Sequence, residues 1–130
     1  MAFIAAAAVG INMVCGAVVY IAVLLPNNPK FPFTMMRARP AIDVTFAKLQ
    51  HMGFFTNDTV KVMYADSRCS STHAPMEAFN FRYTTKPHIF FGPVCDYALA
   101  PVARFCSVWK TPVVSTGGFS HSFLIDKHGN

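Results

Sequence analysis

The amino-acid sequence predicts an α/β fold, in which a doubly wound parallel sheet carries helices on both faces. Short apolar runs rich in β-branched residues alternate with segments of helical periodicity, and clusters of glycine, proline and asparagine separate them. The clearest unit runs from Ile89 to Gly118, where a strand, a turn, a helix and a second strand follow one another. A βαβ unit this compact requires parallel strands, so we expect parallel pairing throughout the sheet.

Length and composition suit one folded domain. The chain has 130 residues, of which 53% are hydrophobic and only 13% are charged, a balance that argues against disorder. The net charge of +5 would permit binding to nucleic acid or to a membrane surface. The 11 Lys and Arg residues are scattered, however, and form no basic run. We therefore expect no nucleic-acid partner.

Residues 1–17 contain no charged side chain and are dense in Ala, Ile and Val. This segment predicts a secretory signal peptide, with Cys15-Gly16-Ala17 as the small residues of a cleavage site. Because the apolar run continues to Pro26, a membrane anchor remains the alternative. Residues 18–118 are the predicted domain, and the tail of residues 119–130 has no clear period.

The first predicted strand, Val18 to Leu25, is continuously apolar, as expected of a central strand buried on both faces. An amphipathic helix is predicted from Pro40 to Met52, with proline in its first turn and Gly53 after its end. Two arginines, Arg37 and Arg39, precede this helix. Because a cation is unfavourable near a helix N-terminus, we expect a pairing partner for them.

The remaining strands and helices are predicted from the same alternation of short apolar runs with segments of helical periodicity. Val60 to Tyr64 reads as a second strand, Ala74 to about Tyr83 as a second helix, and Ile89 to Phe91 as a third strand. A third helix begins near Asp96 and ends before Thr111-Pro112, after which Val113-Val114 resumes as a strand. The predicted order is therefore βαβαβαβ.

Three stretches carry a family resemblance. The motif G-P-V-C-x-Y-A-x-A-P-V-A-R-F-x-x-x-W-x-x-P-x-x-S-x-G begins at Gly92, V-L-L-P followed by R-x-R-P-A-I occupies residues 23–26 and 37–42, and V-x-Y-x-D-S-x-C occupies residues 62–69. Together they resemble the membrane-distal lobe of natriuretic peptide receptors and, more loosely, the ectodomains of receptor guanylate cyclases. Those ectodomains belong to the type I periplasmic-binding-protein superfamily. The resemblance covers residues 18–118 and implies part of lobe I of that fold.

The resemblance implies a function outside the cell. It implies the ligand-binding region of a transmembrane receptor at the extracellular face of the plasma membrane, which binds a peptide hormone and signals through cyclic GMP or a related route. It also implies a homodimer formed through the helices of this lobe, and a longer parent protein with a second lobe. The alternative is a small-molecule receptor of the same superfamily, with an amino-acid-type ligand near the loop of residues 115–118.

Enzymatic chemistry is not expected in this chain. The sequence contains no G-x-S-x-G, no phosphate-binding G-x-x-x-x-G-K and no paired carboxylates. The loop Pro26-Asn27-Asn28-Pro29 stands where a dinucleotide-binding enzyme would have glycines. The five histidines are dispersed, so we expect no metal site.

The cysteines and one asparagine suggest covalent features of a secreted protein. Cys69 and Cys95 each follow a predicted strand at the same end of the sheet, which leaves pairing open on sequence grounds. The resemblance implies that this pair is bridged. Cys106 shares a helical face with apolar residues and reads as a small buried side chain. Asn57 begins an N-glycosylation sequon, which has meaning only in a secreted protein.

Two further sites follow from the resemblance. The turn at residues 92–95 opens a helix, where free amides attract anions, although capping alone would also explain it. The resemblance implies a structural chloride held by the amides of Val94 and Cys95 and by the hydroxyl of Ser67. Tyr97 matches a tyrosine near the hormone site, with packing against the first helix as the alternative. Arg104 is the second ligand-binding candidate. Arg104 and Trp109, on the same helix, are also candidates for the dimer face or for packing.

Overall fold

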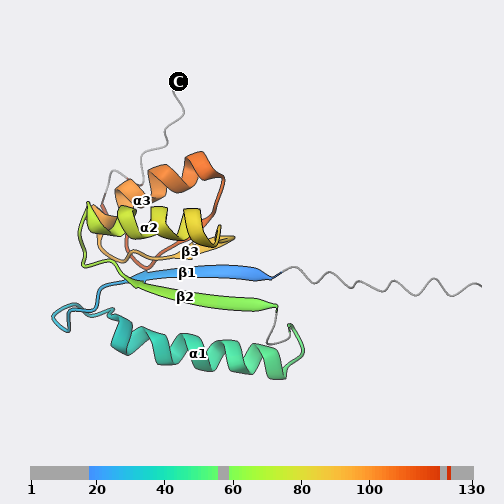
Figure 1. The fold of residues 1–130 in the computed structure, drawn as a ribbon. Coiled ribbons are helices and arrows are strands. Elements are labelled where there is room, and N and C mark those ends of the chain that lie inside the picture. Colours follow the sequence, from blue (N-terminus) through green and yellow to red (C-terminus); the bar gives the residue numbers. More distant parts are fainter. Residues whose placement is uncertain (1–17, 56–58, 121–122, 124–130) are drawn as a thin grey trace, which may run out of the picture.

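The computed structural model describes residues 18–55, 59–120 and 123. Four parallel strands form one sheet in the order β2-β1-β3-β4, and three helices connect them (Figure 1). The elements are β1 (Val19–Leu25), α1 (Met35–His51), β2 (Val60–Asp66), α2 (His73–Thr84), β3 (Ile89–Phe91), α3 (Asp96–Trp109) and β4 (Val113–Val114). The predicted α/β class and the βαβαβαβ order are confirmed.

Strand β1 is the centre of the sheet because it pairs with β2 on one side and with β3 on the other. Its alternate side chains enter two separate apolar cores. Ala22 and Leu24 face α2 and α3, whereas Ile21, Val23 and Leu25 face α1. All five of these residues are buried, which explains why the sequence of this strand is continuously apolar rather than alternating.

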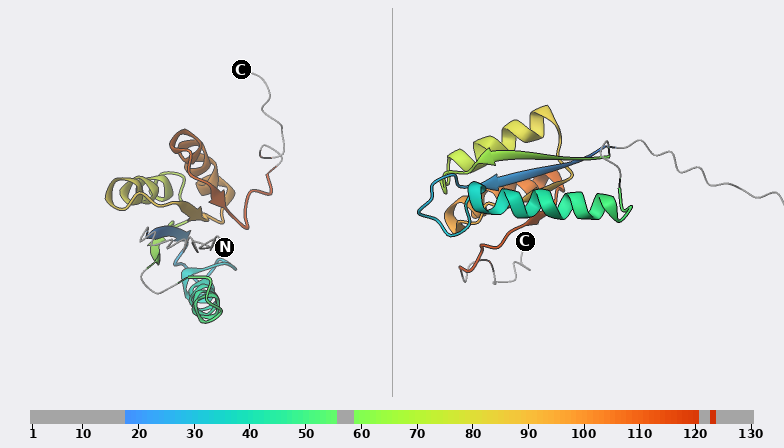
Figure 2. Two further views of the ribbon diagram at one scale, coloured as in Figure 1. Left: turned by 90° about the vertical axis from the view of Figure 1, so that its right-hand side faces the viewer. Right: turned by 90° about the horizontal axis from the view of Figure 1, so that it is seen from below.

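The helices cover the sheet unequally. Helix α1 lies alone on one face, and α2 and α3 lie together on the other, as Figure 2 shows from two further directions. This division follows from right-handed crossovers, because the chain steps one way from β1 to β2 and the other way in both later connections. Helices α2 and α3 bury small residues against each other and the sheet, among them Ala74, Ala78, Ala98, Val102 and Cys106. Helix α1 has no fully buried residue.

The start of α1 differs from the prediction. The helix begins at Met35 rather than at Pro40, so Pro40 lies inside it. A proline there removes one backbone hydrogen bond, normally accepted by the carbonyl four residues earlier. Met36 and Pro40 both lie on the exposed side, where water can take the place of the lost donor. Arg39 has the partner that we expected, since it forms a 3.4 Å ion pair with Asp43.

Three predictions fall on residues that the structure does not describe. These are the signal peptide of residues 1–17, the sequon at Asn57 and most of the tail beyond residue 120. Among the described residues, no helix combines the length and the apolar character needed to cross a membrane.

Candidate functional site

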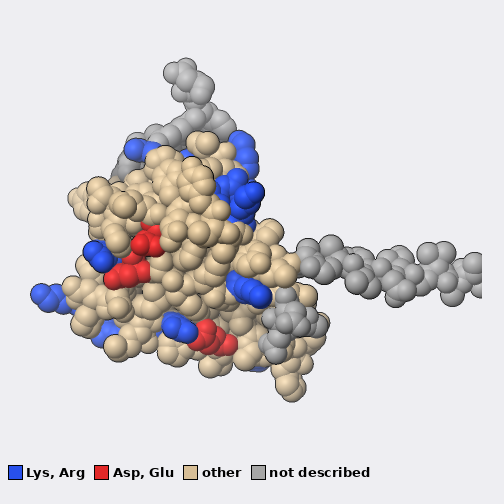
Figure 3. Space-filling view, in the orientation of Figure 1, with Lys and Arg blue, Asp and Glu red and all other residues tan. Residues whose placement is uncertain are grey.

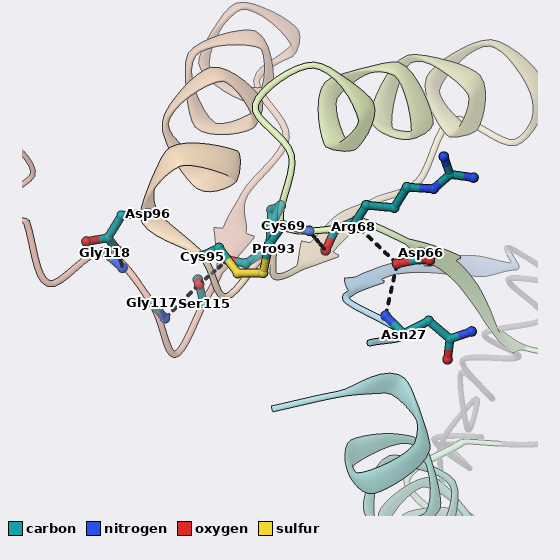
Figure 4. Close-up of a disulfide and its surroundings, with 11 residues drawn as sticks. Asn27, Asp66, Arg68, Cys69, Pro93, Cys95, Asp96, Ser115, Gly117 and Gly118 are labelled. Atoms are coloured by element: carbon teal, nitrogen blue, oxygen red, sulfur yellow. Dashed lines mark hydrogen bonds between the residues drawn. A yellow bond between two sulfur atoms is a disulfide. The ribbon is translucent and has the colours of Figure 1, made fainter. Parts of the chain in front are cut away.

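The candidate site lies at the edge of the sheet where all four parallel strands end. The loops that follow Leu25, Asp66, Phe91 and Val114 meet there. Open α/β sheets bind their ligands at this edge. Figure 4 shows these loops around a disulfide, with polar side chains from three of them directed toward neighbouring backbone.

A disulfide joins the loop after β2 to the turn after β3. Cys69 and Cys95 are bonded, with their Cα atoms 5.4 Å apart. Ser67 lies two residues before this link and is fully buried. Its amide donates to the carbonyl of Leu25, and its hydroxyl accepts a hydrogen bond from the amide of Cys69 at 3.4 Å. The structure therefore brings Ser67 and the turn of residues 92–95 to the same corner of the sheet.

The turn between β3 and α3 leaves amides without protein partners. Within the described part of the chain, no protein acceptor receives the backbone N–H groups of Val94 and Cys95. Cys95 is the N-cap of α3 and has no side-chain cap. Gly92 packs so closely under Leu24 that a Cβ atom would run into the Leu24 carbonyl oxygen. The turn is thus held against β1 with its free amides near the N-terminus of α3, an arrangement that favours anions.

The loop after β4 is fixed to the same turn. The hydroxyl of Ser115 donates to the carbonyl of Pro93 at 2.6 Å and accepts from the amide of Gly117 at 2.9 Å. Gly117 lies so close to Val94 that a Cβ atom at this position would collide with the Val94 carbonyl. Asp96 extends this contact, because its carboxylate accepts hydrogen bonds from the amides of Gly118 and Ser120. The hydroxyl of Ser115 and the amides of Gly117 and Gly118 therefore have partners within the protein.

A second aspartate organises the opposite end of this edge. One carboxylate oxygen of Asp66 accepts from the amide of Asn27 at 2.9 Å and from the amide of Arg68 at 2.8 Å. The loops after β1 and β2 are joined in this way. Sequence reasoning missed the role of Asp66; it predicted Asp96 as an N-cap or first-turn anion of the third helix, which the structure confirms for the first turn, but not as the acceptor for the loop after β4. The available signal was their position, one at the end of a strand and one in the first turn of a helix, where carboxylates commonly accept backbone amides.

The two ligand-binding candidates on α3 are both exposed. Tyr97 is 85% exposed in the first turn of the helix, so it does not pack against α1. Arg104 lies two turns further along and is also exposed. Trp109 differs, because it is half-buried and packs against Phe79, with ring centroids 4.9 Å apart. Tyr97 lies at the edge where the loops meet, and Arg104 lies farther along the outer side of α3.

A hollow of about 440 Å³ opens between α1 and the sheet beside this edge. Phe33, in the loop after β1, forms part of its wall and is 51% exposed. Residues of β1, β3 and β4 form its floor, and Ala38, Ala41 and Ile42 of α1 form the facing wall. Its lining is almost entirely apolar, with Ser115 and Thr116 as the polar residues at the rim.

One polar cluster on α1 and β2 was not expected from the sequence. The hydroxyl of Tyr64 donates to Asp43 at 2.7 Å, and the guanidinium of Arg39 lies 4.8 Å from the Tyr64 ring centroid. Burial and the neighbouring carboxylate raise the pKa of Tyr64, so it remains a neutral hydrogen-bond donor.

Burial alone raises the pKa of the free Cys106 thiol to about 12. The described residues contain no group of three or more potential metal ligands.

Comparison with known proteins agrees with this geometry. Residues 37–128 match the family model described as the receptor family ligand binding region. The chain is 32% identical over 108 residues to atrial natriuretic peptide receptor 3 from Rattus norvegicus, an alignment that covers 78% of this chain and 20% of the receptor. It is 31% identical over 107 residues to atrial natriuretic peptide receptor 2 from Anguilla japonica, covering 77% of this chain and 10% of that receptor.

Solved structures share the fold at low identity. The branched-chain amino acid transporter substrate binding protein LivJ from Streptococcus pneumoniae superposes with a TM-score of 0.70 at 12% identity, covering 82% of this chain and 30% of LivJ. The leucine binding protein LivK from Thermotoga maritima gives a TM-score of 0.58 at 21% identity, covering 82% of this chain and 29% of LivK. These likenesses show the periplasmic-binding-protein type of fold.

The family match extends over more than half of the chain, and the matched residues include the turn, the disulfide and the helix that form the edge described above. The chain spans about a fifth of the length of the natriuretic peptide receptor 3 sequences that it matches. It belongs to the receptor family ligand-binding region, as a relative of the natriuretic peptide receptors.

Proposed function

We propose that this chain is extracellular ligand-binding sequence of a natriuretic-peptide-receptor-like transmembrane receptor that binds a peptide hormone. The observation that carries the proposal is the exposed Tyr97 beside the disulfide-linked edge, in a chain of this family. An aromatic side chain with a hydroxyl offers a large contact area, and it loses little conformational entropy when a partner covers it. Signalling would pass through cyclic GMP or a related route, with any cyclase reaction outside this chain.

The polar groups of the edge favour a peptide over an amino-acid-type ligand. A small ligand near residues 115–118 would need free hydrogen-bonding groups there. The Ser115 hydroxyl is already bonded to Pro93 and Gly117, and the amide of Gly118 is bonded to Asp96. Tyr97, in contrast, is open to a partner that approaches from outside.

A direct test grafts residues 18–118 into the ectodomain of natriuretic peptide receptor 3 in place of the matching segment. Calorimetric titration would then compare a natriuretic peptide with isoleucine, using the unmodified ectodomain as the control. We expect the graft to bind the peptide and to show no heat with isoleucine. Isoleucine binding without peptide binding would support the small-molecule alternative.

We also propose that the outer face of α2 and α3 forms a homodimer. Three large side chains are exposed there: Met76 on α2, and Phe105 and Val108 on α3. Such a patch is expected to be covered by another protein surface. Arg104 borders the patch and would lie at the rim of the contact. Sedimentation equilibrium should show a dimer that the substitution Val108→Asp converts to a monomer.

The residues of the proposed chloride site fit a bound anion. Two amides without described protein acceptors, a buried hydroxyl and a helix N-terminus converge at one corner. The amides of Val94 and Cys95 would donate to the ion, and Ser67 would complete its shell. The site would hold the β3–α3 turn in its observed form and take part in no reaction.

The proposed location is the secretory pathway and the outer face of the plasma membrane, with the parent protein anchored in that membrane. The disulfide supports an oxidising compartment. N-terminal sequencing of protein from a secreting cell should begin near Val18. A product that retains Met1 and fractionates with membranes would support the anchor alternative.

A further inference from the structure

A second hollow lies far from the candidate site, at the C-terminal ends of α2 and α3. It has a volume of about 220 Å³. Phe79, Tyr83 and Trp109 supply aromatic walls, and Arg82 and Lys86 supply two cations. These residues come together because α2 and α3 run in the same direction and end at the edge where the strands begin.

The charge around this hollow is positive and is not compensated. The described residues contain four carboxylates, those of Asp43, Asp66, Glu77 and Asp96, and none of them lines the hollow. Lys110 directly follows Trp109 and adds a third cation at this end. Figure 3 shows a cluster of Lys and Arg side chains at the upper right, on the side of the C-terminal ends of α2 and α3, with further Lys and Arg side chains spread over the surface and the visible Asp and Glu side chains away from this cluster.

Arg82 has a structural role at the end of α2, but this role leaves it able to contact a ligand. A basic residue in the last turn of a helix interacts favourably with the helix dipole, and Arg82 occupies such a position in α2. Its guanidinium also lies 6.0 Å from the centroid of the Trp109 ring, which places it along one wall. Lys86 lies beyond the end of α2 and is exposed. The hollow thus presents cationic donors beside ring faces.

The size of the hollow indicates what it could hold. Pockets for complete small ligands usually measure about 300–1,000 Å³, so this hollow suits a single ring-sized group that belongs to a larger molecule. The group must carry negative charge for Arg82 and Lys86 and a ring face for the aromatic walls. Lys110 outside the hollow extends the positive surface along the molecule, which favours a chain of repeated anionic units.

We propose that this hollow binds one unit of a sulfated glycosaminoglycan chain. Arg82 and Lys86 would bind the sulfate and carboxylate groups through charge-assisted hydrogen bonds. Tyr83 and Trp109 would contact the apolar face of a sugar ring. Nucleic acid offers similar chemistry, but the disulfide and the extracellular location in the proposed function favour a glycan. The choice of glycan therefore rests on that location.

The test measures binding of a fully sulfated heparin hexasaccharide to the full chain by calorimetry, with a desulfated hexasaccharide and an RNA oligonucleotide as comparison ligands. The substitution pair Arg82→Gln and Lys86→Asn removes both cations of the hollow. Asn suits position 86 because the backbone there has a φ of 50°. The matched control, Lys30→Gln with Lys48→Gln, removes the same charge from exposed sites on the opposite side of the sheet.

We expect the hollow variant to bind the sulfated hexasaccharide at least about tenfold more weakly, and the control to change by less than about twofold. Equal losses in both variants would show that only net charge matters and would overturn the proposal. Equal affinity for the desulfated sugar or for RNA would overturn it too. These readouts do not depend on peptide binding, so the proposed hormone function could fail while this one holds. Sedimentation of each variant confirms that its oligomeric state is unchanged, and Lys86→Asn alone, at an exposed position, serves if the pair fails to fold.

Discussion

The amide of Gly118 donates a 2.6 Å hydrogen bond to the carboxylate of Asp96, 22 residues earlier in the chain. The same carboxylate accepts a second bond from Ser120 at 3.0 Å. Asp96 is also the acidic residue in the first turn of α3, where it is favourable to the helix dipole. One side chain thus starts a helix and holds the loop that follows β4.

Replacing Asp96 should therefore destabilise the whole edge. We expect Asp96→Ala to lower the free energy of unfolding by about 1–3 kcal/mol, because two amides lose a charged acceptor. Glu77→Ala is the matched control, since it removes only an i,i+4 pair with His73 on a helix surface and should cost less than about 0.5 kcal/mol. Urea unfolding of both variants measures the difference. Equal losses would mean that the Asp96 contacts contribute nothing beyond a surface charge.

Gly53 and Gly92 have nearly the same φ, so substitutions at these two positions distinguish the cost of the backbone conformation from the cost of packing. Gly53 has a φ of +80° in open space, and Gly92 has a φ of +81° directly under the Leu24 carbonyl. Gly53→Ala should cost about 1 kcal/mol for the left-handed conformation alone. Gly92→Ala should cost at least about 2 kcal/mol more, because the added methyl group collides with backbone. Similar unfolding midpoints for the two variants would contradict the close approach of the β3–α3 turn to β1.

The strands were predictable, and the contacts among the loops were not. β1, β3 and β4 fall within one residue of their predicted bounds, because buried parallel strands carry a continuous apolar signal. The start of α1 was wrong because proline is commonest in a first turn, whereas here Pro40 lies deeper in the helix on an exposed face. The roles of Asp66 and Asp96 depend on which loops meet at the edge, which periodicity does not encode. The disulfide pairing and the chloride residues came from family resemblance rather than from spacing.

The three described cysteines should behave differently toward alkylating reagents. Cys69 and Cys95 close a loop with a sequence separation of 26, so replacing both with alanine should cost about 3 kcal/mol on the chain-entropy model. Cys106 is 1% exposed, and burial raises the pKa of its thiol to about 12. It should resist iodoacetamide at pH 8.5 until the protein unfolds, with Cys106→Ala giving the background. Peptide mapping that finds Cys106 in a disulfide would contradict the observed pairing.

The raised pKa of Cys106 also predicts a loss of stability at high pH. The folded protein favours the neutral thiol, and the unfolded chain ionises near the ordinary value of 9. The contribution of this group is therefore complete below pH 9 and is lost as the pH rises toward about 12. Stability of the wild-type chain should fall more steeply over this range than that of Cys106→Ala. The same pH dependence of the free energy of unfolding in both proteins would show that the thiol ionises freely in the folded state.

Removal of chloride should weaken the fold if the anion occupies its proposed site. With gluconate in place of chloride at constant ionic strength, we expect a lower unfolding midpoint, because a ligand that binds only the folded state stabilises it by mass action. Ser67→Ala should reduce this dependence, whereas Ser107→Ala, at an exposed position on α3, should leave it unchanged. An unfolding midpoint of the wild-type chain that is the same in chloride and in gluconate would contradict the proposed chloride site.

The most direct test of the receptor function is peptide affinity in the grafted ectodomain carrying Tyr97→Ala. Tyr97 is 85% exposed, so its loss should leave the thermal midpoint nearly unchanged. Loss of an interface anchor should weaken peptide binding by at least about 1–2 kcal/mol, or roughly five- to thirtyfold. Val44→Ala, which truncates an exposed apolar residue on α1, should alter neither quantity. Unchanged peptide affinity in Tyr97→Ala would contradict the claim that this edge of the sheet meets the hormone.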